Sequence, residues 1–277
     1  MNMKPTRTSR ITIYEHSMAG LVLFLCCNLV ARAVPPPSVQ IPHSDQVPAL
    51  SASFDDPSWN GAAKIVGLQL SENPPYNPTT VPQTTVLLKW DRDNLYVRFI
   101  CEGDQEIYSP FSGRDAPYYK GDVVEVFLDP KGDGREYVEI EVSPNNGVLD
   151  QIYLCTAEPK YKANGRLEPA FIDRDLWTFP SWNLDGLRTA AANHGSKGWI
   201  VDMAIPASIL KRTGTKEFGP MVLRANFLRY DYPVRPQADG SIGERVLVPL
   251  NWAPVQGGCP HISADRMGYL DLVEHPN

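Results

Sequence analysis

The alternation of hydrophobic and polar positions is clearest in residues 119–144. Two runs in this stretch repeat with a period of two, the period of a β-strand, and a turn-rich loop separates them. The pattern therefore predicts a β-hairpin with one apolar side. An antiparallel sheet commonly exposes one face to water, so a solvated face is the simplest interpretation of the other side. The glutamates on that side are Glu125, Glu139 and Glu141.

Similar short runs recur along the rest of the chain, and almost no stretch has helical periodicity. One short helical turn is expected at 206–211, where Pro206 starts a helix without losing a backbone hydrogen bond. The short strands between turns indicate an all-β protein, a single antiparallel β-sandwich with long loops. Besides the hairpin, strands are predicted at 62–70, 84–90, 95–102, 148–155, 187–194, 199–205, 222–230, 245–250 and 269–273.

The first residues have the composition of a targeting segment. Three basic residues precede an apolar run, which ends in an Ala-Arg-Ala sequence suited to signal peptidase. Residues 1–33 are therefore predicted to be a signal peptide, and the mature protein is expected to be secreted, periplasmic or at the cell surface. Residues 34–48 are rich in proline and are predicted to be an extended leader. Residues 49–277 are then expected to form the single domain.

The charge balance narrows the classes of partner. The chain has 26 basic and 32 acidic residues. Loss of the predicted signal peptide removes four basic residues and one acidic residue, which leaves 22 against 31 and a net charge of −9. Nucleic acids and anionic membranes are bound through clusters of Lys and Arg, so this balance disfavours both. Neutral ligands and cations remain open.

Cysteine and histidine spacing gives little support for a disulfide framework or a zinc site. Cys101, Cys155 and Cys259 follow the predicted signal peptide, and an odd number allows at most one disulfide. Cys101 and Cys155 both end strand-like runs and could pair, and three isolated buried thiols are an interpretation at least as good, because cysteine packs like a small hydrophobic residue. No His or Cys pair has the spacing of zinc ligands.

Carboxylates are the candidate catalytic groups, because the chain lacks a Gly-x-Ser-x-Gly sequence and its histidines are scattered. Glycoside hydrolysis uses two carboxyl groups about 5–10 Å apart. Glu125 and Glu141 are predicted to share one face of the hairpin, so a glycoside hydrolase is one candidate function. The structural alternative is an ion-paired sheet face with Arg98 nearby.

Residues 129–134 half-match a calcium-binding loop, in which alternate carboxylates and a glycine turn surround the ion. Lys131 stands at a ligand position, and a plain hairpin turn is therefore favoured there. Structural calcium elsewhere in the protein is expected, without defined ligands.

Aromatic residues gather in the predicted loops. Stacked aromatic rings suit the apolar faces of sugars, with polar groups at the edges to bind the hydroxyls. Packing over the ends of the sandwich is the alternative. The residues concerned are Tyr108, Phe111, Tyr118, Tyr119, Trp177, Trp182 and Trp252.

Six segments in a fixed order resemble the family 9 carbohydrate-binding module. They are LKWDRDNLYVRF (88–99), GDVVEVFLDP (121–130), YVEIEVSPNNGVLD (137–150), WIVDMAIPASIL (199–210), LRANFLRYD (223–231) and MGYLDL (267–272). The resemblance implies a jelly-roll-like sandwich that holds the end of a glycan between two aromatic rings, often with structural calcium. It also implies association with glycoside hydrolases such as endo-xylanases, a ligand of the xylan or cellulose type, and no catalysis by the module itself.

The resemblance also implies a set of ligand-binding residues. Tyr119 and His261 fall at the two aromatic platforms, and Glu125 falls at a sugar-contacting acid. Glu141 stands where the xylan-binding members have an arginine. The other residues expected around the pocket or in its framework are Asn226, Arg229 and Trp252.

A second resemblance concerns the sandwich architecture, which is also found in domains that hold haem b for electron transfer. Such a site needs axial ligands such as Met or His. Met203, Met221 and Met267 are available, although a single Met on a strand is typical of a hydrophobic core. A haem-binding domain is therefore the remaining alternative function.

Overall fold

The computed structural model describes residues 35–72, 74–103, 106–157, 175–236, 241–255 and 259–275. The predicted signal peptide, residues 1–33, lies outside these ranges. In the described part of the chain, no helix is both long enough and apolar enough to cross a membrane.

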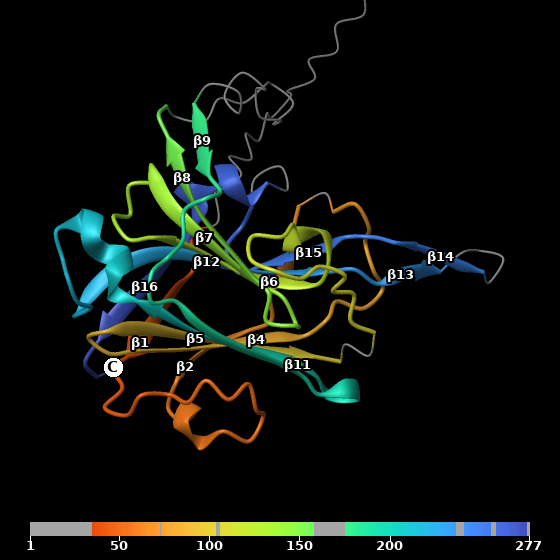
Figure 1. Ribbon diagram of the computed structural model, residues 1–277, viewed down its shortest axis with the longest axis horizontal. Coiled ribbons are helices and arrows are strands. Elements are labelled where there is room, and N and C mark those ends of the chain that lie inside the picture. The colour runs from red at the N-terminus through yellow and green to blue at the C-terminus, as the bar shows by residue number, and fades with distance from the viewer. Residues whose placement is uncertain are drawn as a thin grey trace, which may run out of the picture. The chain divides into compact units, whose positions relative to one another are not determined.

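Two main sheets form a β-sandwich, and Figure 1 shows them as separate layers. The smaller sheet has the strand order β10-β11-β5-β4-β2. Its strands are Arg188–Asn193 (β10), Gly198–Pro206 (β11), Asn94–Glu102 (β5), Thr84–Trp90 (β4) and Ala63–Val66 (β2). Every pairing within it is antiparallel, as the alternating runs at 84–90, 95–102 and 199–205 predicted.

The larger sheet has nine strands, seven of them in the order β1-β16-β12-β6-β7-β8-β9. They are Ser38–Pro42 (β1), Gly268–Val273 (β16), Met221–Asp231 (β12), Val123–Asp129 (β6), Glu136–Val142 (β7), Val148–Cys155 (β8) and Leu176–Phe179 (β9). The strands Val248–Asn251 (β15) and Gln69–Leu70 (β3) extend this sheet beside β12. A separate short hairpin joins Val234–Pro236 (β13) to Ile242–Arg245 (β14).

The predicted hairpin is confirmed as β6 and β7, and its apolar side faces the main core. Val124 pairs with Val142, and Glu125 pairs with Glu141. The apolar side chains of β6 join one buried cluster with residues of the smaller sheet, among them Phe99. Burying a side chain of this size contributes roughly 1.5–3 kcal/mol, so the alternation fixes which side of each strand faces inward.

The domain starts earlier than the predicted boundary at residue 49. β1 pairs in parallel with β16, from Ser38 opposite Tyr269 to Pro42 opposite Val273. A proline is tolerated on an edge strand, because its missing N–H removes no bond from the sheet interior. β1 is the edge strand of its sheet, so the proline-rich sequence that suggested a leader still forms a strand.

Another difference follows from local backbone geometry. The strand predicted at 62–70 divides into β2 and β3, which belong to different sheets. Gly67 lies between them with φ of 74°, a left-handed conformation that glycine adopts readily, and the chain changes sheet there. The predicted helical turn is confirmed as a 3-10 helix at Ala207–Thr213. Shorter 3-10 turns also occur in the loops, among them Pro57–Trp59 and Tyr118–Lys120.

The turn at 129–134 is held by its own backbone. The Asp129 carboxylate is fully buried and accepts hydrogen bonds from the N–H groups of Lys131, Gly132 and Gly134 at 3.1, 2.8 and 2.7 Å. This is the arrangement of a plain hairpin turn, in which an aspartate side chain bonds to the backbone that follows it.

Cys101 and Cys155 are both buried, on strands of different sheets. No disulfide joins Cys101, Cys155 and Cys259. The suggested pairing of the first two is therefore wrong, and the alternative of separate thiols holds. The sequence shows that both cysteines end predicted strands, but this position does not show which sheet each strand joins.

The outer face of the smaller sheet holds a buried ion pair. Arg98 on β5 lies opposite Asp202 on β11, and its Nε and Nη2 atoms donate to the two carboxylate oxygens at 2.6 and 2.8 Å. Nη1 donates to the Ser53 carbonyl at 2.9 Å, and the guanidinium lies 4.7 Å from the centre of the Trp59 ring. The expectation that Arg98 pairs with the glutamates of the central hairpin is wrong, because β5 belongs to the other sheet.

Candidate functional site

The polar side of the central hairpin forms the floor of a cavity of about 460 Å³. Its walls come from residues 115–119, residues 178–180 and His261. These segments cover the sheet, and Glu125, Glu139 and Glu141 are each only 1% exposed. The interpretation of this side as a solvated face is therefore wrong. The burial of this side depends on loops, and the strand pattern does not show where those loops run.

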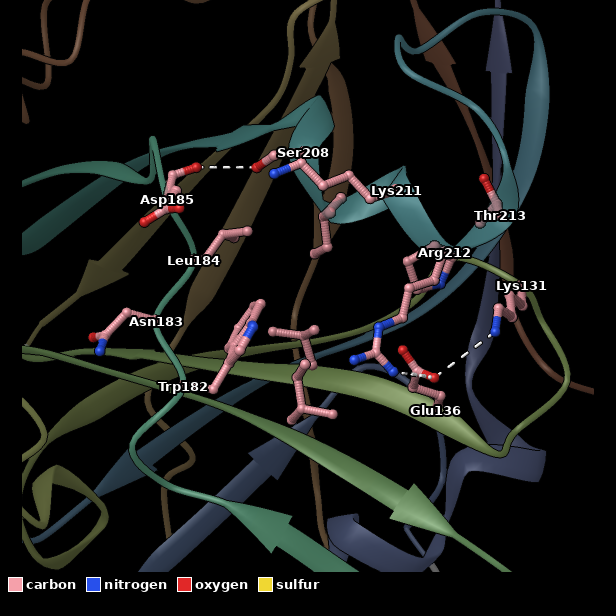
Figure 2. Close-up of a pocket in the computed structure, with 14 residues that line it drawn as sticks. Lys131, Glu136, Trp182, Asn183, Leu184, Asp185, Ser208, Lys211, Arg212 and Thr213 are labelled. Atoms are coloured by element: carbon pink, nitrogen blue, oxygen red, sulfur yellow. Dashed lines mark hydrogen bonds and ion pairs between the residues drawn. The ribbon is translucent and has the colours of Figure 1, made fainter.

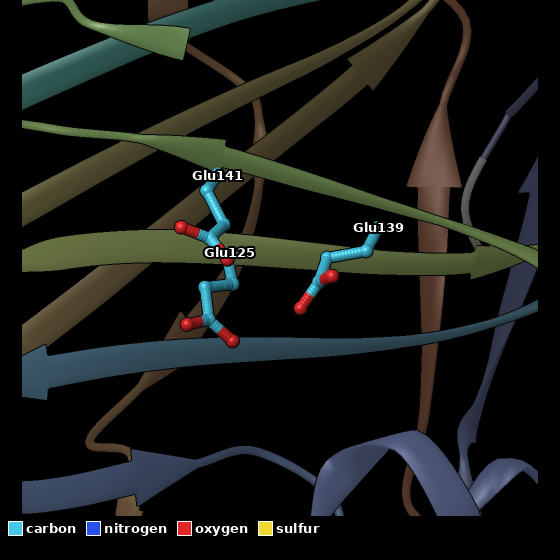
Figure 3. Close-up of side chains that lie close together, drawn as sticks. All are labelled: Glu125, Glu139 and Glu141. Atoms are coloured by element: carbon cyan, nitrogen blue, oxygen red, sulfur yellow. The ribbon is translucent and has the colours of Figure 1, made fainter. Parts of the chain in front are cut away.

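Three glutamates meet on this floor because of the register of the hairpin. Glu125 on β6 lies directly opposite Glu141 on β7, and Glu139 is two residues earlier on the same side of β7. Figure 3 shows the three side chains close together, and one oxygen from each lies within 4.8 Å of the others. Like charges this close repel strongly away from water, so the group must hold protons or face cations.

Glu139 has partners for both of its oxygens. His261 Nε2 lies 3.1 Å from Oε1, while Gln151 Nε2 and the Tyr153 hydroxyl donate to Oε2 at 2.6 and 2.9 Å. Burial alone would raise the pKa of Glu139, but the charge of His261 and these hydrogen bonds bring it below the usual value. Burial likewise disfavours a charged His261, yet Glu139 raises the pKa of that imidazole well above its ordinary value. The two form an ion pair.

Glu125 and Glu141 are different, because in each the Oε2 atom has no hydrogen-bond partner among the described residues. Burial raises the pKa of both carboxyls well above the ordinary value, and the negative charge of Glu139 raises both further. Glu125 and Glu141 also face each other. The Tyr119 backbone N–H bonds to Glu141 and only partly offsets these effects. The pair therefore lacks the positive partner that Glu139 has.

Aromatic rings complete the walls. Tyr119 is 43% exposed at the rim, whereas Tyr153 and Tyr230 are deeper. Tyr153 stacks on Tyr137 with ring centres 5.3 Å apart and planes 9° apart, and His261 lies 4.9 Å away on a tilted plane. The cavity thus combines flat aromatic surfaces with buried acceptors.

Comparison with known proteins adds a fold match. No protein-family model matches the chain, and no curated protein matches it by sequence. A family 9 carbohydrate-binding module (CBM9) from Caldicellulosiruptor kristjanssonii, solved with glucose, matches in structure with a TM-score of 0.52 and 17% identity, over 87% of this chain and 97% of that one. This chain has the CBM9 fold. A CBM9 module from the same organism, solved with cellotriose, matches with a TM-score of 0.52 and 16% identity, over 87% of this chain and 95% of that one.

A candidate carbohydrate-binding protein from Bacteroides uniformis matches with a TM-score of 0.58 and 16% identity. The match covers 86% of this chain and 100% of that one. The resemblance to CBM9 inferred from the six sequence segments is therefore confirmed at the level of the fold. At this identity the match does not transfer ligand-binding residues, so the site depends on its own geometry.

Four of the seven predicted binding residues line one cavity of this CBM9 fold. They are Tyr119, Glu125, Glu141 and His261. Sequence analysis did not assign Gln151, Tyr153 and Tyr230, which also line it. The first two lie on β8 opposite Glu139 and Tyr137, so pairing the predicted strand 148–155 with the hairpin in register would have placed them on the same face.

Arg229 lies elsewhere. It is opposite Val124 on β6 and points to the core side of β12, where it pairs with Asp231 at 3.1 Å and lines a separate hollow of about 550 Å³. The alternation of the strand contains this information, because Phe227, two residues earlier, is a core residue.

Asn226 and Trp252 support the CBM9 framework. The Asn226 side chain donates to the Ala253 carbonyl and accepts from the Ala253 N–H at 3.1 and 2.8 Å, which ties β12 to the segment after β15. Trp252 packs against Phe227, with ring centres 5.6 Å apart. Neither lines the cavity, although both were expected among the residues around the pocket or in its framework.

The methionines proposed as haem ligands lie in hydrophobic clusters. Met203 belongs to the core between the sheets, and Met267 belongs to a second cluster with Phe127 and Tyr137. Both are buried and neither lines the cavity. Their packing is that of core residues, the structural alternative considered from the sequence.

A smaller hollow, of about 130 Å³, lies beside Trp182 (Figure 2). Three of its charged groups are already paired with one another, since Glu136 lies 3.0 Å from Arg212 and 3.8 Å from Lys131. This hollow lacks the unpartnered acceptors of the larger cavity, and it is the weaker candidate.

The rim residue Tyr119 depends on its neighbour Tyr118, which is buried and donates to the Gly113 carbonyl. A Cβ atom on Gly147 would overlap the Tyr118 hydroxyl. We therefore expect Gly147→Ala to displace this loop, to lower the free energy of unfolding by about 1–3 kcal/mol and to weaken ligand binding. Urea unfolding measures the first effect. Gly219→Ala is the control, since nothing lies within 4 Å of the added atom, and an unchanged Gly147→Ala variant would contradict this account.

Proposed function

We propose that this protein binds carbohydrate and that the cavity over β6 and β7 is its binding site. The observation that carries the proposal is the position of the cavity in a CBM9 fold, at the four residues that the resemblance had assigned to sugar binding. Two of the matching structures are CBM9 modules solved with glucose and with cellotriose. The volume of about 460 Å³ lies in the range of small-molecule sites, about 300–1,000 Å³.

The chemistry of the walls supports the same proposal. A sugar ring has apolar faces that stack on aromatic rings and hydroxyls that donate to carboxylates. Tyr119 offers a ring at the rim, and the floor offers the unpartnered Oε2 atoms of Glu125 and Glu141. We further propose that the protein is exported and takes part in the breakdown of xylan-type or cellulose-type polysaccharides beside glycoside hydrolases.

Substitution of the rim aromatic tests the binding site. We expect Tyr119→Ala to weaken oligosaccharide binding about tenfold, because the stacked ring is lost. Isothermal titration calorimetry with a panel of xylo-, cello- and amino-oligosaccharides measures the change. Tyr269→Ala is the matched control, since Tyr269 is 40% exposed on β16 and does not line the cavity. Absence of heat with every sugar of the panel would refute the proposed function.

Glycoside hydrolysis is a second candidate function, and one observation favours it. The cavity holds carboxyl groups whose pKa values are shifted in opposite directions, raised in Glu125 and lowered in Glu139. Such a divergence separates an acid from an ionised carboxylate in glycosidases. Release of a chromophore from aryl glycosides, lost in Glu125→Gln and kept in Glu136→Gln, would establish this activity.

A further inference from the structure

The charges that line the cavity do not balance. Its acidic residues are Asp115, Glu125, Glu139 and Glu141, whereas its one basic residue in the described part of the chain is His261. His261 is already paired with Glu139 at 3.1 Å. No Lys or Arg among the described residues lines the cavity. The Glu125 and Glu141 pair therefore has no cation of its own.

Two basic residues that flank the covering segment 115–119 have contacts elsewhere. Lys120 lies over the Tyr119 ring, with its Nζ atom 5.7 Å from the ring centre. Arg114 lies 3.4 Å from Asp115 and also pairs with Asp150. Neither lines the cavity, so among the described residues the pair has no Lys or Arg to neutralise it when it is ionised.

The geometry of the pair suits a single donor group between the two carboxylates. Glu125 and Glu141 lie opposite each other, and each has an Oε2 atom that is buried and without a hydrogen-bond partner. One oxygen from each of Glu125 and Glu141 lies within 4.8 Å of the other, and a charged N–H···O bond is about 2.8 Å long, so one nitrogen can reach an oxygen of both side chains. An ammonium group carries three donors and a positive charge, whereas a hydroxyl offers one donor and no charge.

We propose that the cavity is selective for amino sugars, whose ammonium group binds between Glu125 and Glu141. This inference rests on the proposed carbohydrate-binding function and names its ligand class.

A bare metal ion accounts for less of the site. Both oxygens of Glu139 already accept hydrogen bonds, so Glu139 has less free lone-pair capacity for an ion than Glu125 and Glu141 have. The cavity volume of about 460 Å³ and its aromatic walls suit a ring-sized organic ligand. A metal ion is therefore the competing outcome that the experiment must exclude.

Proton exchange gives the proposal a second signature. The pair faces Glu139 on β7, Tyr230 on β12, and Asp115, Tyr118 and His261 on the covering loops. Burial raises the pKa of Glu125 and of Glu141, and the charge of Glu139 raises both further, so the empty pair takes up protons more readily than free carboxyl groups do. An ammonium group favours two ionised carboxylates, so its binding opposes this uptake and is expected to release protons.

The experiment compares three β-1,4-linked trisaccharides that differ at C2: cellotriose, the N-acetylglucosamine trimer and the glucosamine trimer. Calorimetry at pH 6.5, where the amine is protonated, is run in two buffers of different ionisation enthalpy. We expect the glucosamine trimer to bind at least about tenfold more tightly than either neutral trimer, with release of a proton. Raising the salt concentration should reduce the preference.

Two variants locate the preference. Glu141→Gln and Glu125→Gln should each abolish the preference. If one of the two variants folds poorly, the other still tests the proposal. Glu136→Gln is the control, because Glu136 lies on the same strand outside the cavity. Thermal unfolding shows that each variant is folded.

Each remaining outcome is decisive. Equal or tighter binding of cellotriose, or a preference that survives in both Glu141→Gln and Glu125→Gln, would overturn the amino-sugar proposal and leave carbohydrate binding intact. Binding of none of the three trimers would overturn the amino-sugar proposal, and absence of heat with the xylo-oligosaccharides as well would refute carbohydrate binding. Binding of calcium chloride alone, lost in Glu141→Gln and preventing binding of the glucosamine trimer, would assign the pair to a metal ion and overturn the proposal.

Discussion

Replacing Arg98 by methionine is expected to lower the free energy of unfolding by about 3–5 kcal/mol, the usual cost of removing one partner of a buried ion pair. Asp202 is fully buried and would keep a single described donor, the Ala52 N–H at 2.8 Å. The Ser53 carbonyl would lose its donor and Trp59 would lose the guanidinium packed on its ring. Few other single substitutions on this sheet remove so many contacts at once.

Urea unfolding of Arg98→Met measures the loss of stability. The midpoint temperature of thermal unfolding should fall by about 10 °C for a domain of this size. The double variant Arg98→Met with Asp202→Leu tests the reason. Because an uncompensated buried charge is the main cost, removing the carboxylate as well should recover much of the stability. A double variant less stable than Arg98→Met would show that Asp202 acts through its bond to Ala52 instead.

Glu125→Gln is expected to make the ligand-free protein more stable at pH 8, by about 1–3 kcal/mol. The substitution removes one of the two facing carboxyl groups, and the new amide can donate a hydrogen bond to the Glu141 carboxylate that remains. The sign follows from the pKa shifts. Glu125 and Glu141 have folded pKa values raised above the ordinary 4.5, so the folded state holds more protons than the unfolded state above pH 4.5. Stability therefore falls as the pH rises through that window.

Thermal unfolding between pH 4.5 and 8.5 measures this effect. The gain in Glu125→Gln should be small at pH 4.5 and largest at pH 8. His261, whose folded pKa is raised, adds stability that is lost as the pH rises through that value. Glu139, whose folded pKa is lowered, adds stability that is lost at low pH. His261 and Glu139 are present in the parent and in the variant. Glu136→Gln is the control. A Glu125→Gln variant less stable than the parent at pH 8 would contradict the expectation.

The fold was predictable from the sequence where burial imposes alternation. The hairpin of β6 and β7 is an example, because an apolar residue at every second position has one stable orientation. β1 was missed, because local composition does not show which strand will offer an edge to residues 38–42. The sheet change at Gly67 was missed for a related reason, since it depends on a single backbone conformation within one apolar run.

The site was predictable only in part. Tyr119, Glu125, Glu141 and His261 followed from the order of sequence segments, and the structure brings them together. The same comparison misplaced Arg229, although the alternation of its own strand points it to the core. Burial of the glutamates and the pairing of Glu139 with His261 depend on loops far apart in sequence, and no strand pattern encodes those contacts.

The pairing of His261 also limits what chemistry the cavity can perform. Its Nε2 atom faces Glu139 at 3.1 Å and its Nδ1 atom faces the Cys259 sulfur at 3.7 Å. Burial opposes a charge on the ring, but the facing Glu139 raises its pKa and so favours the imidazolium form, which has no free lone pair. In that form it can neither accept a proton from a hydroxyl group nor ligate a metal ion. A ligand meets it only as a flat surface, and any proton transfer in the cavity is left to the carboxyl groups.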